Sequence, residues 1–261
     1  MTPKLLIIPD AHAEPNYDND RFTWLGNLIF EEKPDVVVCL GDWFDMASLS
    51  SHDKGKKSFE GRRYKQDVAV GVDAFEKTWA PTFKWNKQRS KNHKAQYNPE
   101  RIFLYGNHEA RLDKTVQLQP ELEGAISYDD YQVSKYWTRA YPFKAIAQVE
   151  GICFCHYFPA GVLGKPIGGD NSAANLINKL HQSCVAGHSH IQDVSVRTAA
   201  DGKKMLGIVA GCYTHPESHG DWNFNTYKMW YRGVTMLYDV HDGFAEGIEF
   251  VTQDRIKRLY A

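Results

Sequence analysis

The chain has 261 residues, of which 43% are apolar and 24% are charged, and both fractions are ordinary for a soluble globular protein. The formal net charge of −1 gives the whole molecule no strong electrostatic preference for a partner. The longest apolar runs, Leu5 to Ile8 and Val36 to Leu40, are strand-sized and too short to cross a bilayer. No apolar signal segment precedes the first of them. We therefore expect an unprocessed cytoplasmic protein with no membrane span and no obligate protein partner.

Five cysteines are scattered through the chain, and none of them forms a C-x-x-C pair. All but Cys212 lie inside apolar segments, which favours buried free thiols over disulfides or a cysteine-rich zinc site. The five are Cys39, Cys153, Cys155, Cys184 and Cys212.

Short apolar runs alternate with amphipathic stretches over the first two-thirds of the chain, and closely spaced strands follow. In chain order, this pattern predicts a strand at Lys4 to Pro9, a helix at Phe22 to Lys33, a strand at Asp35 to Leu40, a helix at Arg62 to Trp79, a strand at Arg101 to Tyr105, a helix at Pro120 to Ile126, strands at Phe143 to Val149 and Gly151 to His156, a helix at Ser172 to His181, and strands at Ser183 to Ala186, Val194 to Thr198, Met205 to Ala210, Val234 to Val240 and Phe244 to Val251. The dipeptide Asp201-Gly202 is a hairpin signal between two of the later strands.

The pattern of alternating βα units followed by a strand-rich half is compatible with two facing sheets that have helices on their outer faces. We therefore predict an α/β fold, namely a four-layer αββα sandwich of two mixed β-sheets flanked by helices. The sequence shows no internal repeat, low-complexity segment or linker. A single domain over residues 1–261 is the expected organisation.

Two segments are long for connections inside a compact domain, where such loops are usually functional or disordered. Residues 46–99 form a basic, partly helical insertion, with 13 Lys or Arg residues against 6 Asp or Glu residues between Met46 and Arg101. This asymmetry favours a surface for an anionic substrate, with a solvated loop as the alternative. Residues 214–231 form an aromatic-rich loop that either contacts a substrate or packs against the sheet, and its aromatic and histidine residues are His215, His219, Trp222, Phe224, Tyr227, Trp230 and Tyr231.

Residues of metal-binding type follow the ends of five apolar strands. Carboxylates, imidazoles and an amide together suit hard-to-borderline divalent cations. The clusters are Asp10-Ala-His12, Gly41-Asp42-Trp-Phe-Asp45, Gly106-Asn107-His108-Glu109, His156, and Gly187-His188-Ser189-His190. Each cluster alone has a plain alternative, such as a turn signal or a hydrogen-bonded core histidine. All five in order, each after an apolar strand, indicate one metal centre.

The spacing within two of the clusters explains how their side chains converge. In an extended chain, residues i and i+2 point to the same side. Asp10 with His12, and His188 with His190, therefore aim two ligands at one point if the extended conformation persists. Ligands at the carboxyl ends of strands also lie where α/β proteins place their sites.

The series D-x-H, G-D-x-x-D, G-N-H-E, a lone histidine and G-H-x-H resembles the calcineurin-like metallophosphoesterase superfamily, in particular short single-domain members of the phage or bacterial kind. The resemblance runs from Asp10 to His190 and implies two divalent metal ions bridged by Asp42. It also implies a catalytic role for His108, supported by Asp45, and an orienting role for Glu109. The implied ligands are Asp10, His12, Asp42 and His190 for one metal, and Asp42, Asn107, His156 and His188 for the other.

The sequence departs from the family's patterns at two places. The protein serine/threonine phosphatase branch carries an arginine after the second motif and another before G-N-H-E, whereas this chain has Met46-Ala47 and Leu104-Tyr105 there. A protein phosphatase is therefore not favoured. Tyr157 follows the lone histidine where the family often has glycine, so His156 is the ligand with the weakest sequence support.

The resemblance implies hydrolysis of a phosphate ester by direct attack of a metal-bridging hydroxide, with Mn²⁺ the expected metal and Fe, Zn or Ni as alternatives. The basic insertion favours a phosphodiester substrate, in DNA, RNA or a nucleotide. A small phosphomonoester is the second enzymatic alternative, and a non-catalytic metal-binding scaffold is the alternative from another class. The residues expected to contact the substrate are Arg62, Arg63, Tyr157 and His215.

Overall fold

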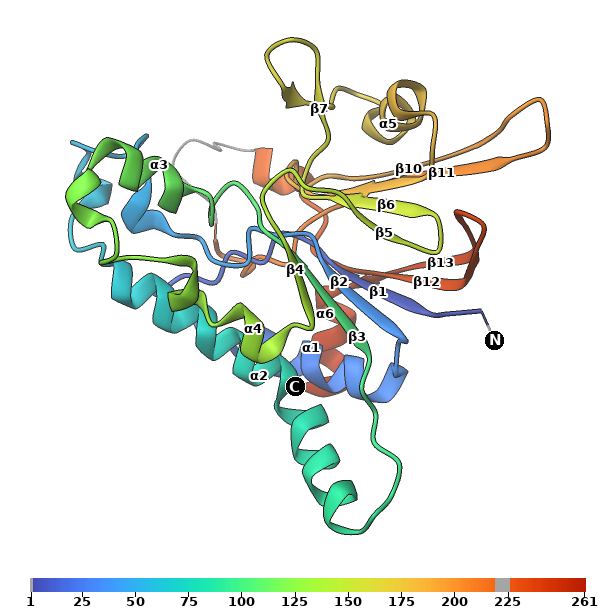
Figure 1. The fold of residues 1–261 in the computed structure, drawn as a ribbon, viewed down its shortest axis with the longest axis horizontal. Coiled ribbons are helices and arrows are strands. Elements are labelled where there is room, and N and C mark those ends of the chain that lie inside the picture. The colour runs from blue at the N-terminus through green and yellow to red at the C-terminus, as the bar shows by residue number, and fades with distance from the viewer. Residues whose placement is uncertain (1, 219–225) are drawn as a thin grey trace.

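The apolar runs of the sequence form the inner strands of two β-sheets in the computed structural model, which describes residues 2–218 and 226–261 (Figure 1). The first sheet has the strand order β13-β12-β1-β2-β3-β4, in which the four strands β1 to β4 run parallel and β12 and β13 are antiparallel additions. Its strands are β1 (Leu5–Ile8), β2 (Val36–Cys39), β3 (Glu100–Leu104), β4 (Arg139–Tyr141), β12 (Gly233–His241) and β13 (Phe244–Thr252).

The second sheet lies against the first and has the strand order β10-β11-β9-β6-β5. Strands β6, β9 and β11 are parallel, and β5 and β10 pair antiparallel with them at the two edges. The strands are β5 (Ala147–Val149), β6 (Ile152–Cys155), β9 (Cys184–Ala186), β10 (Gln192–Thr198) and β11 (Lys204–Ala210). A small hairpin of β7 (Pro159–Ala160) and β8 (Lys165–Pro166) stands apart from both sheets.

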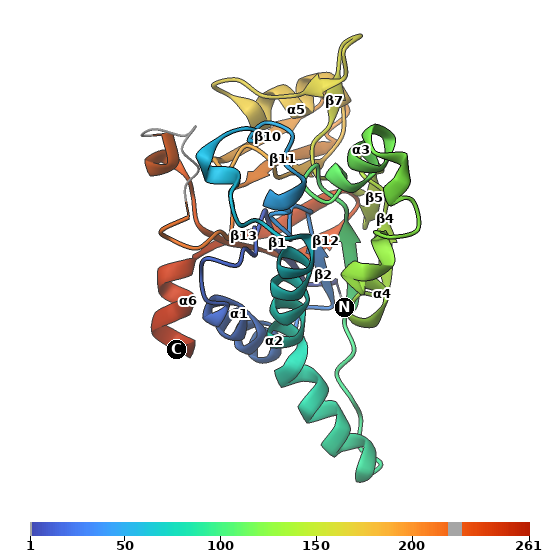
Figure 2. The same cartoon turned by 90° about the vertical axis from the view of Figure 1, so that its left-hand side faces the viewer.

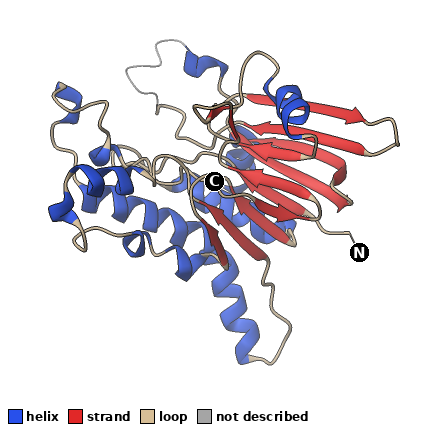
Figure 3. Cartoon of the chain, turned by 45° about the horizontal axis from the view of Figure 1, so that its top comes forward, coloured by secondary structure: helices blue, strands red, loops and turns tan. Residues whose placement is uncertain are grey.

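Helices cover the outer faces of the two sheets, so that four layers result (Figures 1 and 3). Helices α1, α2 and α6 lie on the first sheet, and α5 lies on the second. The helices are α1 (Asp20–Glu32), α2 (Tyr64–Lys91), α3 (Arg111–Leu118), α4 (Val133–Tyr136), α5 (Ser172–Leu180) and α6 (Gln253–Tyr260). Short 3₁₀ turns occur at η1 (Ala47–Leu49), η2 (Lys57–Phe59), η3 (Pro120–Leu122), η4 (Tyr128–Tyr131) and η6 (Thr226–Met229). The predicted αββα sandwich is confirmed.

The core follows the strand alternation. Leu6 and Ile8 of β1 pack under the helices, whereas Leu5 and Ile7 face the second sheet. Because both faces of this sheet are covered, the strands need apolar residues at every position rather than at alternate ones. The five cysteines are buried and free, as predicted.

Several predicted elements differ from the structure. The helix predicted at Pro120 to Ile126 is only the turn η3, and the helix of this region, α3, ends two residues before Pro120. The strand predicted from Phe143 begins only at Ala147, and β4, α4 and α6 were not predicted. Helix α6 shows why, because only Gln253 and Ile256 in it are buried and its apolar pattern is correspondingly sparse. None of the helices within residues 2–218 and 226–261 is long and apolar enough to span a membrane.

One buried charge anchors the loop that follows β1. The guanidinium of Arg21 on α1 donates hydrogen bonds to the carbonyls of Ala11 (3.1 Å), His12 (3.3 Å) and Tyr213 (3.2 Å). Burial lowers the pKa of Arg21 to about 10, which leaves the side chain charged at neutral pH. Arg21 therefore ties the segment after β1, which carries Asp10 and His12, to the segment after β11.

Candidate metal centre

The residues predicted as metal ligands come together where the carboxyl ends of strands from both sheets meet. Asp10, Asp42 and Asn107 follow β1, β2 and β3 of the first sheet, and His156 and His188 follow β6 and β9 of the second. The two sheets, which are the inner layers of the fold, thus both contribute ligand residues at the carboxyl ends of their strands. The structure brings all seven predicted ligands into a single cluster, with the contacts described below.

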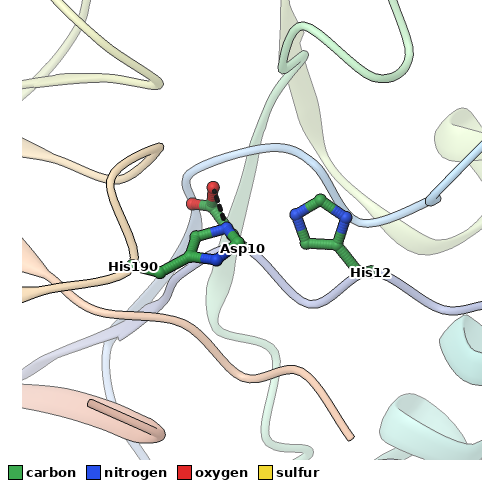
Figure 4. A group of neighbouring side chains, drawn as sticks. All are labelled: Asp10, His12 and His190. Atoms are coloured by element: carbon green, nitrogen blue, oxygen red, sulfur yellow. Dashed lines mark ion pairs between the residues drawn. The ribbon is translucent and has the colours of Figure 1, made fainter. Parts of the chain in front are cut away.

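A first group consists of Asp10, His12 and His190, whose potential ligand atoms all lie within 4.8 Å of one another (Figure 4). His190 Nε2 is 3.3 Å from Asp10 Oδ2. His12 Nδ1 is hydrogen-bonded to Asp45 Oδ1 at 2.9 Å, which orients the ring and leaves Nε2 for the cluster. This arrangement is typical of a histidine prepared for a metal.

A second group consists of Asp42, His156 and His188, again within 4.8 Å of one another. His156 Nε2 lies 3.4 Å from Asp42 Oδ2 and 2.8 Å from Asn107 Oδ1, so the amide joins this group. His156 Nδ1 is bound to the carbonyl of Leu40 at 3.0 Å, which again directs Nε2 inward. Burial and the neighbouring His156 lower the pKa of His188, and the neutral imidazole is the form that binds metals.

Asp42 lies between the two groups. Its carboxylate is 3.8 Å from His12 Nε2 on one side and 3.4 Å from His156 Nε2 on the other. Burial raises the pKa of Asp42, but the imidazoles of His156, His108 and His12 outweigh it and hold that pKa well below its usual range. The same balance, with His156 and His190, lowers the pKa of Asp10. Both carboxylates are therefore ionised inside the protein.

The backbone at the ligands is not extended, which corrects the i, i+2 interpretation of the sequence. His12, His188 and His190 have φ values of 44°, 70° and 60°, and Asp42 has a φ of 48°. Non-glycine residues rarely occupy this left-handed region, and such strain concentrates at functional sites. Asp10 with His12, and His188 with His190, therefore converge through a tight local turn rather than through strand alternation.

Glycine is required where the turns touch. A Cβ atom added to Gly106 would lie 2.1 Å from Asp42 Oδ1, and one added to Gly187 would lie 2.3 Å from Asp10 Oδ1. Both distances are far below any van der Waals contact. These two glycines let the turn after one strand reach the carboxylate of another.

Glu109 is the buried support behind these turns. Its Oε2 accepts hydrogen bonds from the backbone N–H groups of Asp42 (3.0 Å) and Gly106 (2.8 Å), and its Oε1 accepts one from Phe44 (2.9 Å). Burial and the charge of Asp42 raise the pKa of Glu109 to about 7, against the backbone N–H groups that lower it.

His108 and Asp45 lie at the cleft side of the cluster. The His108 backbone N–H donates to Asp42 Oδ1 (2.8 Å), and its Nδ1 is 2.7 Å from the carbonyl and 3.2 Å from the carboxylate of Asp45. Since both Nδ1 neighbours are acceptors, Nδ1 carries the proton and Nε2 accepts a hydrogen bond from Arg111 Nη2 at 3.0 Å. His108 also falls within 4.8 Å of His12 and Asp42, but its Nε2 is already occupied by Arg111.

Arg111 was not identified from the sequence. Its Nη1 donates to the carbonyls of Asp45 (2.7 Å) and Met46 (3.2 Å). No ion pair joins its guanidinium to a carboxylate in the part of the chain that the structure describes. The available signal was its spacing, because Arg111 stands three residues after His108 at the start of α3 and so faces the same side.

A cleft of about 820 Å³ opens over the cluster. His12, Asp42, Asn107 and the two histidines after β9 form its floor, and the segment between β2 and α2 forms its far wall. Of the predicted substrate contacts, Arg62 and Arg63 line this wall together with Lys56. Arg62 is held in place by Asp53 Oδ2 (2.8 Å) and the carbonyl of Ala47 (3.1 Å).

The other two predicted substrate contacts are not part of the described cleft lining. The Tyr157 ring packs with its centroid 4.9 Å from that of His188. His215 stacks at 4.5 Å on Tyr17, which does line the cleft. Of the predicted aromatic loop, Trp230 lines the cleft against His190, whereas His219, Trp222 and Phe224 lie outside the described residues.

The cluster fits divalent metal ions on its own chemistry. Two ionised carboxylates, four imidazoles and an amide oxygen are directed at one region, a donor set that suits Mn, Fe, Zn or Ni. His12 Nε2 is buried and has no hydrogen-bond partner among the described residues. A buried polar atom without a partner costs free energy, which a bound cation would offset.

We expect Gly106→Ala to lose metal, because the added Cβ displaces the Asp42 carboxylate from between the two groups. Metal per chain, measured by inductively coupled plasma mass spectrometry after dialysis against limiting Mn²⁺, should fall well below that of the parent. The matched control is Gly168→Ala, since nothing lies within 4 Å of a Cβ at that position. Parental metal content in Gly106→Ala would contradict the close approach.

Comparison with known proteins places this geometry in a family. Solved structures similar to the chain include the E. coli phosphoesterase YfcE (13% identity, TM-score 0.40, covering 95% of this chain and 100% of that one) and a second structure (13% identity, TM-score 0.41, covering 97% and 99%). Both TM-scores are below 0.5, so neither similarity supports a conclusion about the fold or function of this chain. No curated protein matches the chain. The family model of calcineurin-like phosphoesterases matches residues 3–168, well over half of the sequence and four of its five clusters, and the chain belongs to that family.

Proposed function

We propose that this phosphoesterase is a dinuclear-metal phosphodiesterase that acts on nucleic acid or nucleotides, within one domain spanning residues 1–261. The observation that carries the proposal is the position of Asp42, which belongs to the group with His156 and His188 and also lies 3.8 Å from His12 Nε2 of the first group, at the floor of one cleft. A residue shared in this way is what a pair of adjacent cations requires. Family membership supports the metal-dependent phosphoesterase activity itself.

The ligand assignment follows the two groups, with Asp42 added to the first because its Oδ2 lies 3.8 Å from His12 Nε2. Asp10, His12, Asp42 and His190 would hold one cation, and Asp42, Asn107, His156 and His188 the other. Two such ions supply Lewis acidity, which neutralises the phosphate charge and lowers the pKa of water so that hydroxide forms near neutral pH. Mn²⁺ is the proposed metal.

Side chains of the cleft supply the remaining parts of the reaction. Arg111 lacks a carboxylate partner in the described chain and faces the cleft, so its guanidinium is suited to bind a phosphate oxygen. Transfer of Arg111 from His108 to the phosphate frees His108 Nε2. After Nε2 has taken up a proton from water, His108 stabilises the charge that develops on the leaving oxygen and donates that proton to it. Asp45 keeps His108 and His12 in orientation from behind.

The substrate class rests on the shape and charge of the cleft. Its volume of about 820 Å³ is much larger than a phosphate group needs, and it lies in the range of about 300–1,000 Å³ of sites for larger ligands. Lys56, Arg62 and Arg63 on the far wall are placed to contact further phosphates of a chain. A phosphomonoester would use only the floor.

Hydrolysis of bis-p-nitrophenyl phosphate and p-nitrophenyl phosphate, compared side by side with Mn²⁺, tests this proposal. We expect the diester to be cleaved faster, with activity abolished by EDTA and restored by Mn²⁺. Asp42→Asn serves as the metal-deficient control and should be inactive. Faster cleavage of the monoester would favour the small-molecule phosphomonoesterase, and a metal-loaded protein without turnover on either ester would favour the scaffold.

His108→Ala is expected to keep its metal content and to lower kcat by about 10²- to 10⁴-fold, the usual range for loss of an acid–base group. Metal analysis and diester kinetics on the same preparation separate the two effects. Loss of metal together with activity would instead make His108 a ligand, in the group that it forms with His12 and Asp42.

Arg111→Ala is expected to raise KM for the diester more than it lowers kcat, because the guanidinium contacts the bound phosphate. Arg111→Lys should recover part of the loss by keeping the charge without the fork-shaped donor. Lys114→Ala, one turn further along α3, is the matched control. An unchanged KM in Arg111→Ala would refute the contact.

A further inference from the structure

Helix α2 extends beyond the sheet that it covers and ends in an arm, which we define as residues 84–98. The arm consists of the last turns of α2 and the segment that returns to β3 (Figures 1 and 2). From Lys87 to Gln96 none of its residues is buried. The arm projects from the amino end of β3, whereas the cleft lies at the carboxyl ends of the strands.

Side-chain hydrogen bonds give the arm a defined conformation although it contributes little to the core. The Asn86 side chain donates to the carbonyl of Tyr97 (2.7 Å) and accepts from its backbone N–H (2.9 Å). Arg89 Nε donates to the carbonyl of Ala95 (2.9 Å), and Tyr97 Oη donates to that of Pro34 (2.7 Å). These bonds fix the return of the chain and hold the helical end in a defined orientation.

The charge of the arm is of one sign. It holds five of the chain's 31 Lys and Arg residues and none of its 32 Asp and Glu residues, so the rest of the chain has a formal net charge of −6. Lys84, Lys87 and Lys91 are exposed and stand at i, i+3 and i+7, which places them on one helix face. In the described residues, no ion pair joins any of the three to a carboxylate.

Helix stability does not account for this pattern. Cations in the last turn interact favourably with the helix dipole, which explains Arg89 and Lys91. Lys84 and Lys87 precede that turn, and like charges three or four residues apart destabilise a helix. The stability of the helix therefore does not explain the exposed lysines at positions 84 and 87.

We propose that the lysine face of the arm is a docking surface for the phosphodiester backbone of nucleic acid, separate from the catalytic cleft. The choice of this polyanion rests on the proposed function, and its fit rests on charge complementarity along a line of lysines. A strand held by the arm leaves the cleft free, and the arm raises the local concentration of substrate near it. The contact is to backbone phosphates, so it is independent of base sequence.

Binding of labelled single-stranded DNA, duplex DNA and RNA, followed by fluorescence anisotropy over a range of salt concentrations, tests the proposal. The protein carries His108→Ala so that metal is retained and cleavage is slow. The arm variant is Lys84→Gln/Lys87→Gln/Lys91→Gln. The control is Lys165→Gln/Lys179→Gln/Lys203→Gln, which removes the same charge from exposed positions elsewhere.

For the arm variant we expect Kd to rise about tenfold at low salt. The slope of log K against log salt should become shallower by about 2 on single strands and by about 3 on duplex DNA, as loss of three phosphate contacts predicts. The control variant should bind like the parent. Preference among the three oligonucleotides identifies the natural form. Equal losses in both variants, or arm-dependent binding to phosphatidylglycerol vesicles without binding to oligonucleotides, would overturn the proposal.

Hydrolysis of bis-p-nitrophenyl phosphate by the arm variant, with His108 intact, keeps this test separate from that of the proposed function. The small diester does not reach the arm, so its kcat/KM should remain at the parental value. Arm-dependent binding in a protein that cleaves no diester would refute the proposed function and leave the arm proposal standing. Diester cleavage with no arm-dependent binding would refute the arm proposal and leave the proposed function standing.

Discussion

The carboxylate of Glu109 is the constraint on which the candidate centre depends. It accepts hydrogen bonds from backbone N–H groups on both the turn after β2 and the turn after β3. With the two turns joined, Gly106 can approach Asp42 so closely that no side chain fits between them. The Asp42 carboxylate is then held between histidines from both sheets, and the cleft opens above it. Glu109 thereby supports the geometry of the cluster through backbone N–H groups rather than through the ligand side chains.

The identities of the cluster residues and the fold could be predicted from sequence because both depend on local patterns. Apolar strands followed directly by Asp, Asn or His are visible without tertiary information, and parallel strands bring their carboxyl ends to one edge. The conformation at the ligands was not predictable in this way. His12, Asp42, His188 and His190 have positive φ values that tertiary contacts impose, whereas the spacing alone suggested extended chain. Arg111 was missed because its spacing from His108 is a weak signal, and the observation behind its proposed role, a guanidinium without a carboxylate partner among the described residues, needs the assembled structure.

The basic insertion predicted at residues 46–99 separates into two parts that face opposite ends of the molecule. The part before α2 brings Arg62 and Arg63 to the cleft wall, where Asp53 and Glu60 also lie and offset their charge. The lysines of the later part stand on the arm, which itself contains no Asp or Glu. Net charge counted along the sequence merged these two surfaces. The two surfaces are separated in space and are suited to different proposed roles. The cleft wall would position a phosphate at the metal centre, whereas the arm would attract a nucleic acid chain away from it.

The division of the cluster between the two sheets has a consequence for how the protein assembles. Asp10 and Asp42 belong to one sheet, and His156, His188 and His190 belong to the other. Neither ligand group exists until the sheets have docked, so the cations cannot act as an early nucleus for either half. Cations bound at the proposed sites would hold the two sheets together, because they would bind the native state in preference to any state in which the sheets have separated. Depletion of metal in the cell would then have two effects on this enzyme, because it would remove the catalytic activity and would weaken the contact between the two sheets. A protein with separated sheets would be degraded more easily by proteases.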